Sequence, residues 1–308
     1  MPYQIDGKIH FEKCIICNSN AVKKVLSAKD ETVSGENFDI WECDNCKLRF
    51  TQNIPTPSEI GRYYKSDEYI SHSDTQKGLI NSLYHSVRTK TLASKKKLIE
   101  KATGLKNGKI LDLGCGTGAF LNVMKNGGWE VLGIEPDEGA RTKAESLYHI
   151  RALPTDEVYK LGESIFDAIT LWHVLEHVHE LHEYLKILHQ ALKPEGKLFV
   201  AVPNYTSWDA EFYDTYWAAY DVPRHLYHFS PRSMKILLTD HLFHLEEIQP
   251  MWYDSYYVSM LSEKYKHGKT DYINAFFNGW KSNRIARKLN ERASSLIYVS
   301  RKSDDIKG

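Results

Sequence analysis

The sequence lacks any long hydrophobic run. None of its apolar stretches approaches the roughly 20 residues that a membrane-spanning helix needs. The first residues, Met-Pro-Tyr-Gln-Ile-Asp-Gly-Lys, also lack the apolar core of a secretory signal. These absences argue against a membrane-spanning or secreted chain. We therefore expect a cytoplasmic protein without a membrane partner.

The chain also lacks net charge, because 40 Lys and Arg balance 40 Asp and Glu. The charges are unevenly spread: 110–260 holds 11 basic against 22 acidic residues, whereas 71–109 holds 9 against 2 and 261–308 holds 11 against 5. An acidic central region disfavours a large nucleic-acid surface, since phosphates need cationic partners. We do not expect nucleic acid as a partner, and we interpret the basic segments as solvated helix faces.

Cysteine is scarce, yet four of the five cysteines form two Cys-x-x-Cys pairs: Cys14 with Cys17, and Cys43 with Cys46. Two such pairs can bring four thiolates around one zinc ion. Disulfides are the main alternative, but they suit secreted chains. A redox role is another, although it would not need two pairs. A module of roughly 50 residues buries too little core to fold by itself, and bound metal supplies the missing free energy. The pattern predicts structural Zn²⁺ in a small zinc-ribbon-like module over residues 1–56.

Proline is also infrequent, and Pro55 and Pro57 interrupt the chain directly after this module. Residues 57–108 then read as a helical connector, with a short helix opening at Ser58 and one or two amphipathic helices over 78–103. The Lys95-Lys96-Lys97 run within it reads as a solvated face. The remaining residues, 109–308, form the large domain.

Glycine is concentrated where an apolar strand ends: residues 109–118 read Lys-Ile-Leu-Asp-Leu-Gly-Cys-Gly-Thr-Gly. Glycines permit a sharp turn and close approach to a ligand, and the following helix N-terminus favours an anionic group. Asp112 precedes the first glycine, and Glu135 follows the next strand at about the 20-residue spacing of an acid that holds ribose hydroxyls. This pattern predicts a site for an adenosine-like molecule with an anionic group.

From residue 109 onward, strand and helix patterns alternate. Such alternation predicts an α/β fold with a doubly wound, mostly parallel sheet, whose carboxyl edge binds ligands. A sixth strand is expected within 243–260, a helical connection near 271–292 and a last strand over 294–302. The other expected strands are 109–113, 129–134, 149–153, 166–171 and 196–202, and the expected helices lie near 118–126, 138–147, 179–192 and 231–240.

The segment Leu-Asp-Leu-Gly-Cys-Gly-Thr-Gly resembles the first motif of class I S-adenosylmethionine-dependent methyltransferases. The segment Phe-Asp-Ala-Ile-Thr-Leu-Trp-His-Val-Leu-Glu-His-Val at 166–178 resembles the same class, so that the likeness extends over about 109–202. Gly114, Gly116 and Ala119 also fit a looser dinucleotide pattern, which leaves an NAD-type oxidoreductase as an alternative. Asp112 favours the methyltransferase, because an acid there suits an ammonium group and repels a pyrophosphate.

The resemblance implies a Rossmann-like, seven-stranded sheet with an antiparallel last strand, and S-adenosylmethionine as cofactor. It implies that the methionine end of the cofactor lies against Asp112 and the loop residues Gly114, Cys115 and Gly116. By itself, Cys115 reads as a small loop residue, neither ligand nor nucleophile. The resemblance further places the ribose at Glu135 and Pro136, one face of the cofactor at Trp172 and the adenine near 153–156.

Residues 203–230 are rich in aromatic side chains and follow the fifth strand, which predicts a lid or substrate wall. Small-molecule methyltransferases contain similar segments, and some, including deoxysugar C-methyltransferases, also carry a four-cysteine module at the amino end. Histidine titrates near neutral pH and suits a general base. The base candidates are His173, His177, His225 and His228. Of these, we expect His177 to face a helix interior or to cap the helix, which leaves His173, His225 and His228 as the predicted catalytic residues. Arg224 lies in the same segment as His225 and His228. Three cationic or titratable groups within five residues are more than a segment needs if it only covers the sheet edge.

These patterns together predict O- or C-methylation of a small-molecule acceptor such as a sugar, a lipid or a quinone precursor. An RNA methyltransferase, whose zinc module would read RNA, and a non-enzymatic cofactor-binding regulator are the remaining alternatives. The sequence identifies neither the acceptor nor the oligomeric state.

Overall fold

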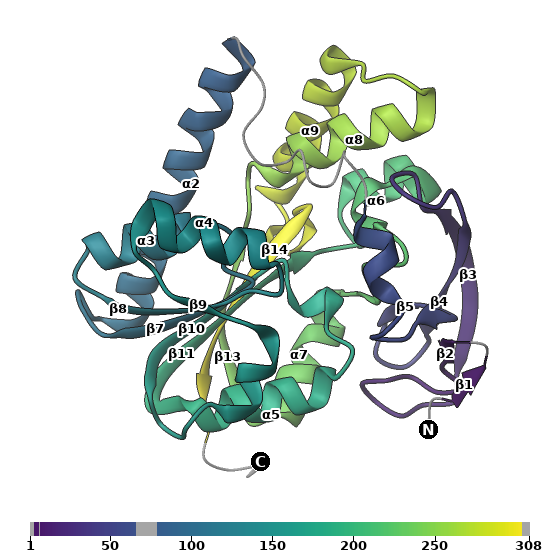
Figure 1. Ribbon diagram of the computed structural model, residues 1–308. Helices are drawn as coiled ribbons and strands as arrows, with labels where there is room; N and C mark the ends of the chain where they lie inside the picture. Colours follow the sequence, from purple (N-terminus) through teal and green to yellow (C-terminus); the bar gives the residue numbers. More distant parts are fainter. Residues whose placement is uncertain (1–2, 6, 66–78, 304–308) are drawn as a thin grey trace.

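Figure 1 shows the computed structural model of the protein, in which residues 3–5, 7–65 and 79–303 are described. Its centre is a seven-stranded sheet with the strand order β13-β14-β11-β10-β7-β8-β9. β14 runs antiparallel to both of its neighbours, and the pairs from β11 to β9 are parallel. This arrangement confirms the predicted Rossmann-like sheet. The strands are β7 (Lys109–Leu113), β8 (Glu130–Ile134), β9 (Ala152–Leu153), β10 (Phe166–Trp172), β11 (Leu192–Pro203), β13 (Phe243–Pro250) and β14 (Ser295–Lys302).

Helices cover both faces of this sheet because successive strand residues point to opposite sides. Ile110 packs in a core with α2 and α3, whereas its neighbour Leu111 packs in a second core with α5 and α7 (Figure 1). Most strand positions are therefore buried, as expected for strands that are covered on both faces. The covering helices are α2 (Leu79–Thr103), α3 (Ala119–Asn126), α4 (Glu138–Tyr148), α5 (Leu181–Ala191) and α7 (Pro231–Asp240).

Two strand boundaries differ clearly from the sequence prediction, while the sixth strand lies within its expected range. β9 starts only at Ala152, because α4 ends in a left-handed residue, His149 (φ 52°), and the chain must straighten first. β11 starts at Leu192 and not at 196, since the expected turn at 193–196 forms an irregularity in the pairing with β10. The sixth strand ends at Pro250, and an unpredicted helix, α8 (Asp254–His267), follows it. α9 (Tyr272–Ala286) and the 3-10 turn η6 (Asn290–Arg292) occupy the expected helical connection.

The amino-terminal residues form two small sheets beside the large one (Figure 1). One contains β1 (Tyr3–Ile5), β2 (Lys8–His10) and β6 (Ile54–Pro55). The other has the order β12-β5-β4-β3, built from β3 (Val22–Lys29), β4 (Asn37–Cys43), β5 (Arg49–Thr51) and β12 (Tyr227–His228). β12 belongs to the predicted lid, so the lid adds an edge strand to the amino-terminal sheet.

The connector contains the 3-10 helix η1 (Ile60–Tyr64) and α2, a single helix. Residues 66–78 of the predicted connector lie outside the described residues. The lid contains α6 (Trp208–Tyr213) and the 3-10 turns η4 (Asp214–Tyr216) and η5 (Ala218–Tyr220). Within the described ranges, none of the helices combines the length and apolar character that crossing a bilayer requires.

Candidate active site

The glycine loop joins β7 to α3 at the carboxyl edge of the sheet. Gly114, Gly116 and Gly118 adopt left-handed φ angles of 64°, 54° and 79°, which explains three glycines at alternate positions. A Cβ on Gly114 would lie 2.5 Å from Val174, whereas one on Gly116 would meet nothing within 4 Å. The loop is therefore packed tightly at its start and open at Gly116, where a ligand can approach the backbone.

Glu135 fixes the loop from the end of β8. Its Oε2 accepts a hydrogen bond from the Gly116 amide (2.8 Å), and its Oε1 accepts one from the Asp137 amide (3.0 Å). Burial raises the pKa of Glu135 despite these two bonds. Arg141 donates to the carbonyls of Glu135 and Pro136 (2.7 Å each), which holds the turn that carries both predicted ribose residues.

Asp112 lies at the end of β7 with 2% of its surface exposed. The Thr170 hydroxyl donates to its Oδ1 at 2.6 Å, but burial raises its pKa to about 7. A buried carboxylate with so little compensation gains from a cationic partner. The site therefore fits a ligand that brings a positive charge to Asp112, as the ammonium group of S-adenosylmethionine would.

Lys95 enters this site from α2. Its Nζ lies 4.1 Å from the centroid of the Trp172 ring, and burial lowers its pKa to about 8 against the opposing charges of Asp112 and Asp254. The expectation that the lysine run is entirely solvated is wrong for Lys95, because consecutive helical residues point about 100° apart and one of the three turns inward. A cation thus already stands over the Trp172 ring, and its charge and that of Asp112 influence each other.

Cys115 is 8% exposed and packs with Phe120 and Leu121 under the loop. Burial raises the pKa of its thiol, so it is an inert core side chain at neutral pH. A contact between Cys115 and the cofactor stays a prediction.

His173 follows β10 in a left-handed conformation (φ 57°). Its Nδ1 lies 3.3 Å from Glu176 Oε1, and its Nε2 lies 2.9 Å from Asp254 Oδ2. Burial alone would lower the pKa of His173, but the two carboxylates outweigh it and raise the pKa to about 10. At neutral pH both ring nitrogens carry protons that are donated, so this geometry favours a positioning role. The role of His173 as a base stays untested.

Glu176, His177 and His225 bring one donor atom each to within 4.8 Å of one another. We call these three residues together with His173 the histidine cluster. The rings of His177 and His225 meet edge to face, with centroids 4.6 Å apart. The sequence placed His177 in or at a helix; it does end the 3-10 turn η3 (Leu175–His177), but its ring faces the lid histidine.

His177 and His225 differ in the groups that their ring nitrogens contact. The His177 Nδ1 lies 3.0 Å from the Arg224 carbonyl and 3.1 Å from the Tyr64 hydroxyl, and burial together with the His225 charge lowers its pKa to about 4. The His225 Nδ1 lies 2.9 Å from the Ala219 carbonyl, which can only accept. Neutral His225 therefore keeps its lone pair on Nε2, which lies 3.9 Å from Asp221 Oδ2. This arrangement is the one that a general base requires.

Glu176 is fully buried, and its Oε2 has no hydrogen-bond partner among the described residues. Its other oxygen, Oε1, is held by His173, and the charge of His173 helps to lower the pKa of Glu176 against the effect of burial. An ionised buried oxygen without a partner is costly, so a hydroxyl or other donor from a ligand would be stabilised there.

The third predicted base, His228, lies in β12 at the junction with the amino-terminal sheet. Its Nε2 lies 3.1 Å from the Thr51 hydroxyl, and its ring meets Tyr220 edge to face at 5.1 Å. Burial lowers its pKa well below the usual range. The structure therefore does not place His228 in the cluster around Glu176, and its role as a base stays a prediction.

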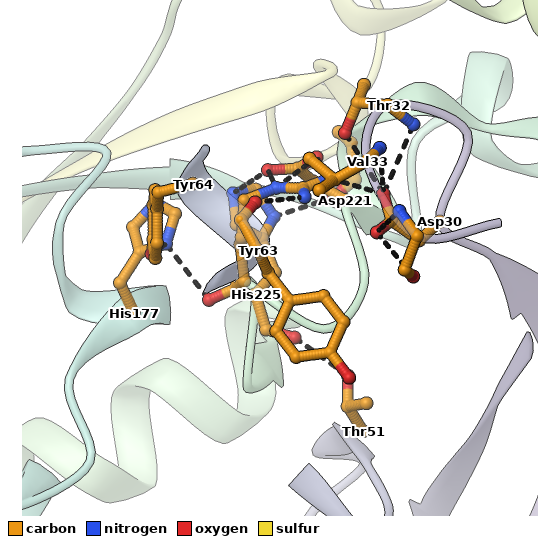
Figure 2. A network of polar contacts seen from close by, with 12 residues as sticks. Asp30, Thr32, Val33, Thr51, Tyr63, Tyr64, His177, Asp221 and His225 are labelled. Atoms are coloured by element: carbon orange, nitrogen blue, oxygen red, sulfur yellow. Dashed lines mark hydrogen bonds and ion pairs between the residues drawn. The ribbon is translucent and has the colours of Figure 1, made fainter. Parts of the chain in front are cut away.

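Arg224 forms the centre of a buried polar network that Figure 2 shows from close by. Its guanidinium donates to Asp30 Oδ1 at 3.0 Å, to both carboxylate oxygens of Asp221 at 2.6–3.1 Å and to the Tyr63 carbonyl at 2.7 Å. Asp30 in turn accepts from the backbone amides of the turn that follows β3. Arg224 thus joins the lid to the amino-terminal module, and its polar character serves this junction.

The four paired cysteines gather at one point of that module. The Sγ atoms of Cys14 and Cys46 are 3.4 Å apart, those of Cys17 and Cys43 are 3.5 Å apart, and all four lie within 4.8 Å of one another. Zinc–sulfur bonds of about 2.3 Å in a tetrahedron place sulfurs about 3.8 Å apart. The residues therefore fit a closed zinc site.

Sequence reasoning missed three residues of the candidate site. Glu176 could have been predicted, because it lies three residues after His173 in the 166–178 segment that resembles methyltransferases. Lys95 was read as solvated. Asp254 gives no local signal, since its partner His173 lies 81 positions away in the sequence.

Comparison with known proteins supports the same interpretation. The ubiquinone biosynthesis O-methyltransferase of Bos taurus mitochondria is 33% identical over 108 residues, which cover 32% of this chain and 29% of that protein. The protein of the same name from Acinetobacter baumannii strain AYE is 30% identical over 113 residues, covering 34% of this chain and 48% of the relative. The chain thus spans less than half the length of these relatives.

A solved structure from Galdieria sulphuraria, provisionally named a sarcosine dimethylglycine methyltransferase, shares the fold. Its TM-score is 0.50 at 15% identity, over 72% of this chain and 88% of that one. In addition, the family model described as a methyltransferase domain matches residues 84–248, more than half of the chain. The match begins in α2 and continues through the glycine loop, the histidine cluster and β13. The chain therefore belongs to the methyltransferase-domain family and has the class I fold that its glycine loop predicted.

Proposed function

We propose that the protein is an S-adenosylmethionine-dependent methyltransferase that methylates a hydroxyl oxygen of a small molecule. The observation that carries the acceptor chemistry is the unpartnered oxygen of buried Glu176 beside His225. The names of the two relatives favour a quinone precursor, while a sugar or lipid hydroxyl presents the same chemistry. O-methylation is favoured over C-methylation because a hydroxyl can donate to Glu176.

The cofactor would lie along the glycine loop. Bound S-adenosylmethionine supplies an activated methyl group, so that the protein needs mainly to orient the acceptor and to remove its proton. Asp112 balances the ammonium group, Glu135 accepts from the ribose hydroxyls, and Trp172 offers its ring face to the positive charge. Exposed backbone at Gly116 leaves room for the ligand to approach the loop.

The histidine cluster would act on the acceptor. As the acceptor enters, Glu176 Oε2 accepts a hydrogen bond from its hydroxyl, and His173 holds Glu176 in its ionised form. The hydroxyl has a single proton, so this bond breaks when the O–H turns to His225 Nε2. His225 Nε2 then takes that proton, because Nδ1 is fixed by the Ala219 carbonyl. His177, with its lowered pKa, stays neutral and adds no competing charge next to His225.

The amino-terminal module would hold one structural Zn²⁺ through Cys14, Cys17, Cys43 and Cys46. Four sulfur ligands close the coordination sphere, which is typical of structural and not catalytic zinc. The extents that we propose are 1–56 for the module, 57–108 for the connector and 109–308 for the catalytic domain, with the lid shared through β12. A cytoplasmic location stays a prediction.

Calorimetry with S-adenosylmethionine and with NAD tests the cofactor. We expect dissociation constants in the micromolar range, about −8 kcal/mol, for S-adenosylmethionine, and no binding of NAD. Binding of NAD alone would overturn the proposal. A thermal-shift screen with cofactor present then compares hydroxylated aromatic precursors, activated sugars and RNA. A shift with RNA alone would favour the RNA methyltransferase, which no contact in the described residues supports.

Metal analysis tests the zinc site. We expect one zinc ion per chain in protein purified under reducing conditions without chelator, and its loss in the Cys43→Ser variant. Cys115→Ser is the matched control, because Cys115 lies in the other domain and should leave the zinc content unchanged. Metal-free, folded wild-type protein would contradict the proposal.

A further inference from the structure

Helix α9 has two faces of opposite character. Its buried face is made of small or polar residues: Ala275, Gly279, Ser282, Asn283 and Ala286. These let α9 approach α8 closely, because a Cβ on Gly279 would lie only 2.9 Å from the Cα of Tyr256. The rotation of α9 about its own axis is therefore fixed by a close helix–helix contact.

The opposite face carries five large side chains that remain exposed: Tyr272 (59%), Ile273 (70%), Phe276 (57%), Phe277 (58%) and Trp280 (45%). We call these residues the aromatic face. Their spacing of one, four, five and eight positions places them in one stripe of the helix. Single exposed apolar residues are ordinary, but a contiguous group of this size marks a surface that binds something.

Cationic side chains accompany this stripe. Arg284 stands over the Trp280 ring at 5.4 Å, and Lys281 stands over the ring of Trp208 at 4.5 Å. Arg287 and Lys288 follow, both exposed, at the end of the helix. Residues 261–308 hold 11 basic against 5 acidic side chains. Exposed Phe, Ile and Trp bordered by Lys and Arg are the composition of helices that lie in the interface of an anionic bilayer.

We infer that α9 docks on the surface of an anionic lipid bilayer, with the aromatic face in the boundary between headgroups and acyl chains. Charge complementarity selects this occupant. The exposed cations that border the aromatic face, Lys281, Arg284, Arg287 and Lys288, attract an anionic surface, which a second copy of this basic face does not offer. At 15 residues the helix is about 22 Å long, too short to span a bilayer but long enough to lie on it.

Hydrophobic run length, on which the expectation of no membrane partner rests, tests only for spanning helices. A search for long hydrophobic runs does not detect an interfacial helix, because the apolar residues of such a helix alternate with polar ones along the sequence. In Figure 1 the α8–α9 hairpin stands at the top of the view, outside the seven-stranded sheet. The first residue of α8, Asp254, binds His173, which connects the hairpin to the histidine cluster. The inference rests on α9 and does not depend on the acceptor.

Vesicle co-sedimentation of the full chain tests this inference. We expect binding to phosphatidylcholine vesicles that contain phosphatidylglycerol, weaker binding to pure phosphatidylcholine, and a decrease with salt. Phe276→Ser/Phe277→Ser and Lys281→Glu/Arg284→Glu should each reduce binding at least tenfold. Leu147→Ser is the matched control, because Leu147 is 59% exposed on α4, away from α9, and its loss should change nothing.

Circular dichroism and S-adenosylmethionine binding of the same variants show whether they fold, and they separate this inference from the cofactor proposal. Wild-type protein that ignores anionic vesicles would overturn the inference, as would variants that bind them unchanged. A wild-type dimer that Phe276→Ser/Phe277→Ser dissociates would assign the aromatic face to a second copy instead. Tight binding of single-stranded RNA that competes with vesicles would assign it to nucleic acid.

Discussion

The glycine-loop site and the histidine cluster lie at the same edge of the sheet, but they are built differently. Asp112, Glu135 and the loop glycines come from a single stretch of chain, 112–135. The histidine cluster contains His173 and His177 after β10 together with His225 of the lid. Its histidines contact Asp254 of α8, the Arg224 carbonyl of the lid and Tyr64 of η1. Residues that lie close together in sequence could be predicted as one site, whereas the contacts that only tertiary packing makes, such as Lys95 over Trp172 and Asp254 against His173, could not.

The two regions also differ in electrostatics. The glycine-loop site holds two buried carboxyl groups whose pKa values are raised by burial. In the histidine cluster most charges already have partners, and the pKa of His173 is raised while that of His177 is lowered. A cationic ligand is therefore expected to change the protonation of the first region and to leave that of the second almost unchanged.

The largest expected effect comes from the junction that supports the histidine cluster. Arg224→Met leaves the buried Asp30 and the partly buried Asp221 without their cation, which should lower the free energy of unfolding by about 3–5 kcal/mol. Urea denaturation measures this. Lys24→Met is the control, because the Lys24–Asp39 pair is half exposed and its loss should cost only about 0–1 kcal/mol. Similar losses in both variants would contradict a special role for the buried network.

The next largest effect is on kcat, which should depend on the histidine cluster and not on the glycine-loop site. His225→Ala should lower kcat by about 10²-fold, because the acceptor proton loses its base, while the Kd for S-adenosylmethionine stays unchanged. Steady-state kinetics and calorimetry measure both. The exposed His244 provides a control variant, His244→Ala, which should behave as wild type. Full activity in His225→Ala together with loss in His173→Ala or His228→Ala would move the base to that residue.

A substitution in the glycine-loop site should have the converse effect, changing the Kd for the cofactor and not kcat. Glu135→Ala removes the acceptor of the ribose hydroxyls and of the Gly116 amide, and should weaken S-adenosylmethionine binding by about 1.5–3 kcal/mol. The kcat at saturating cofactor should change little. Glu138→Ala is the matched control on the same turn, since Glu138 is exposed. An unchanged Kd in Glu135→Ala would show that the acid only shapes the loop.

The smallest effect concerns pH. Asp112 has a pKa of about 7 without ligand, and a cationic cofactor binds its ionised form. Affinity for S-adenosylmethionine should therefore fall about tenfold for each pH unit below 7 and level off above it. Calorimetry between pH 5.5 and 8.5, as a buffer series of about half-unit steps, measures this slope. Asp112→Asn should bind weakly at every pH without a slope, and a wild-type slope in that variant would assign the titration elsewhere.

The contribution of Asp112 to the free energy of unfolding should fall as the pH rises, whereas its contribution to cofactor affinity should increase. Its pKa is higher in the folded chain than the value of about 3.9 in an unfolded one, so the folded state binds the proton more tightly. The contribution is present below about pH 4 and is lost as the pH rises toward 7. Asp112→Asn should accordingly melt at a higher temperature than wild type at pH 8 while binding the cofactor less well.

The sheet and its glycine loop were predictable because their signals are local: apolar strands, alternate glycines and an acid after the next strand. α8 was not, because its buried face contains Ser255, Ser259, Ser262 and Glu263, and so no apolar period marks it. Lys95 and Asp254 were missed for a related reason. Lys and Asp are usually exposed in proteins, and only tertiary packing brings Lys95 to Trp172 and Asp254 to His173.

The pairing of β12 with β5 has a consequence for the order of folding. Thr51 binds the carbonyl of His225 across 174 positions of sequence. The edge of β5 is made early in synthesis but gains its partner only after most of the chain has been synthesised. Contacts of such long range form slowly. Until then the edge is open to pairing with another chain, so that mispairing during synthesis, and not loss of the finished fold, is the expected route to aggregation.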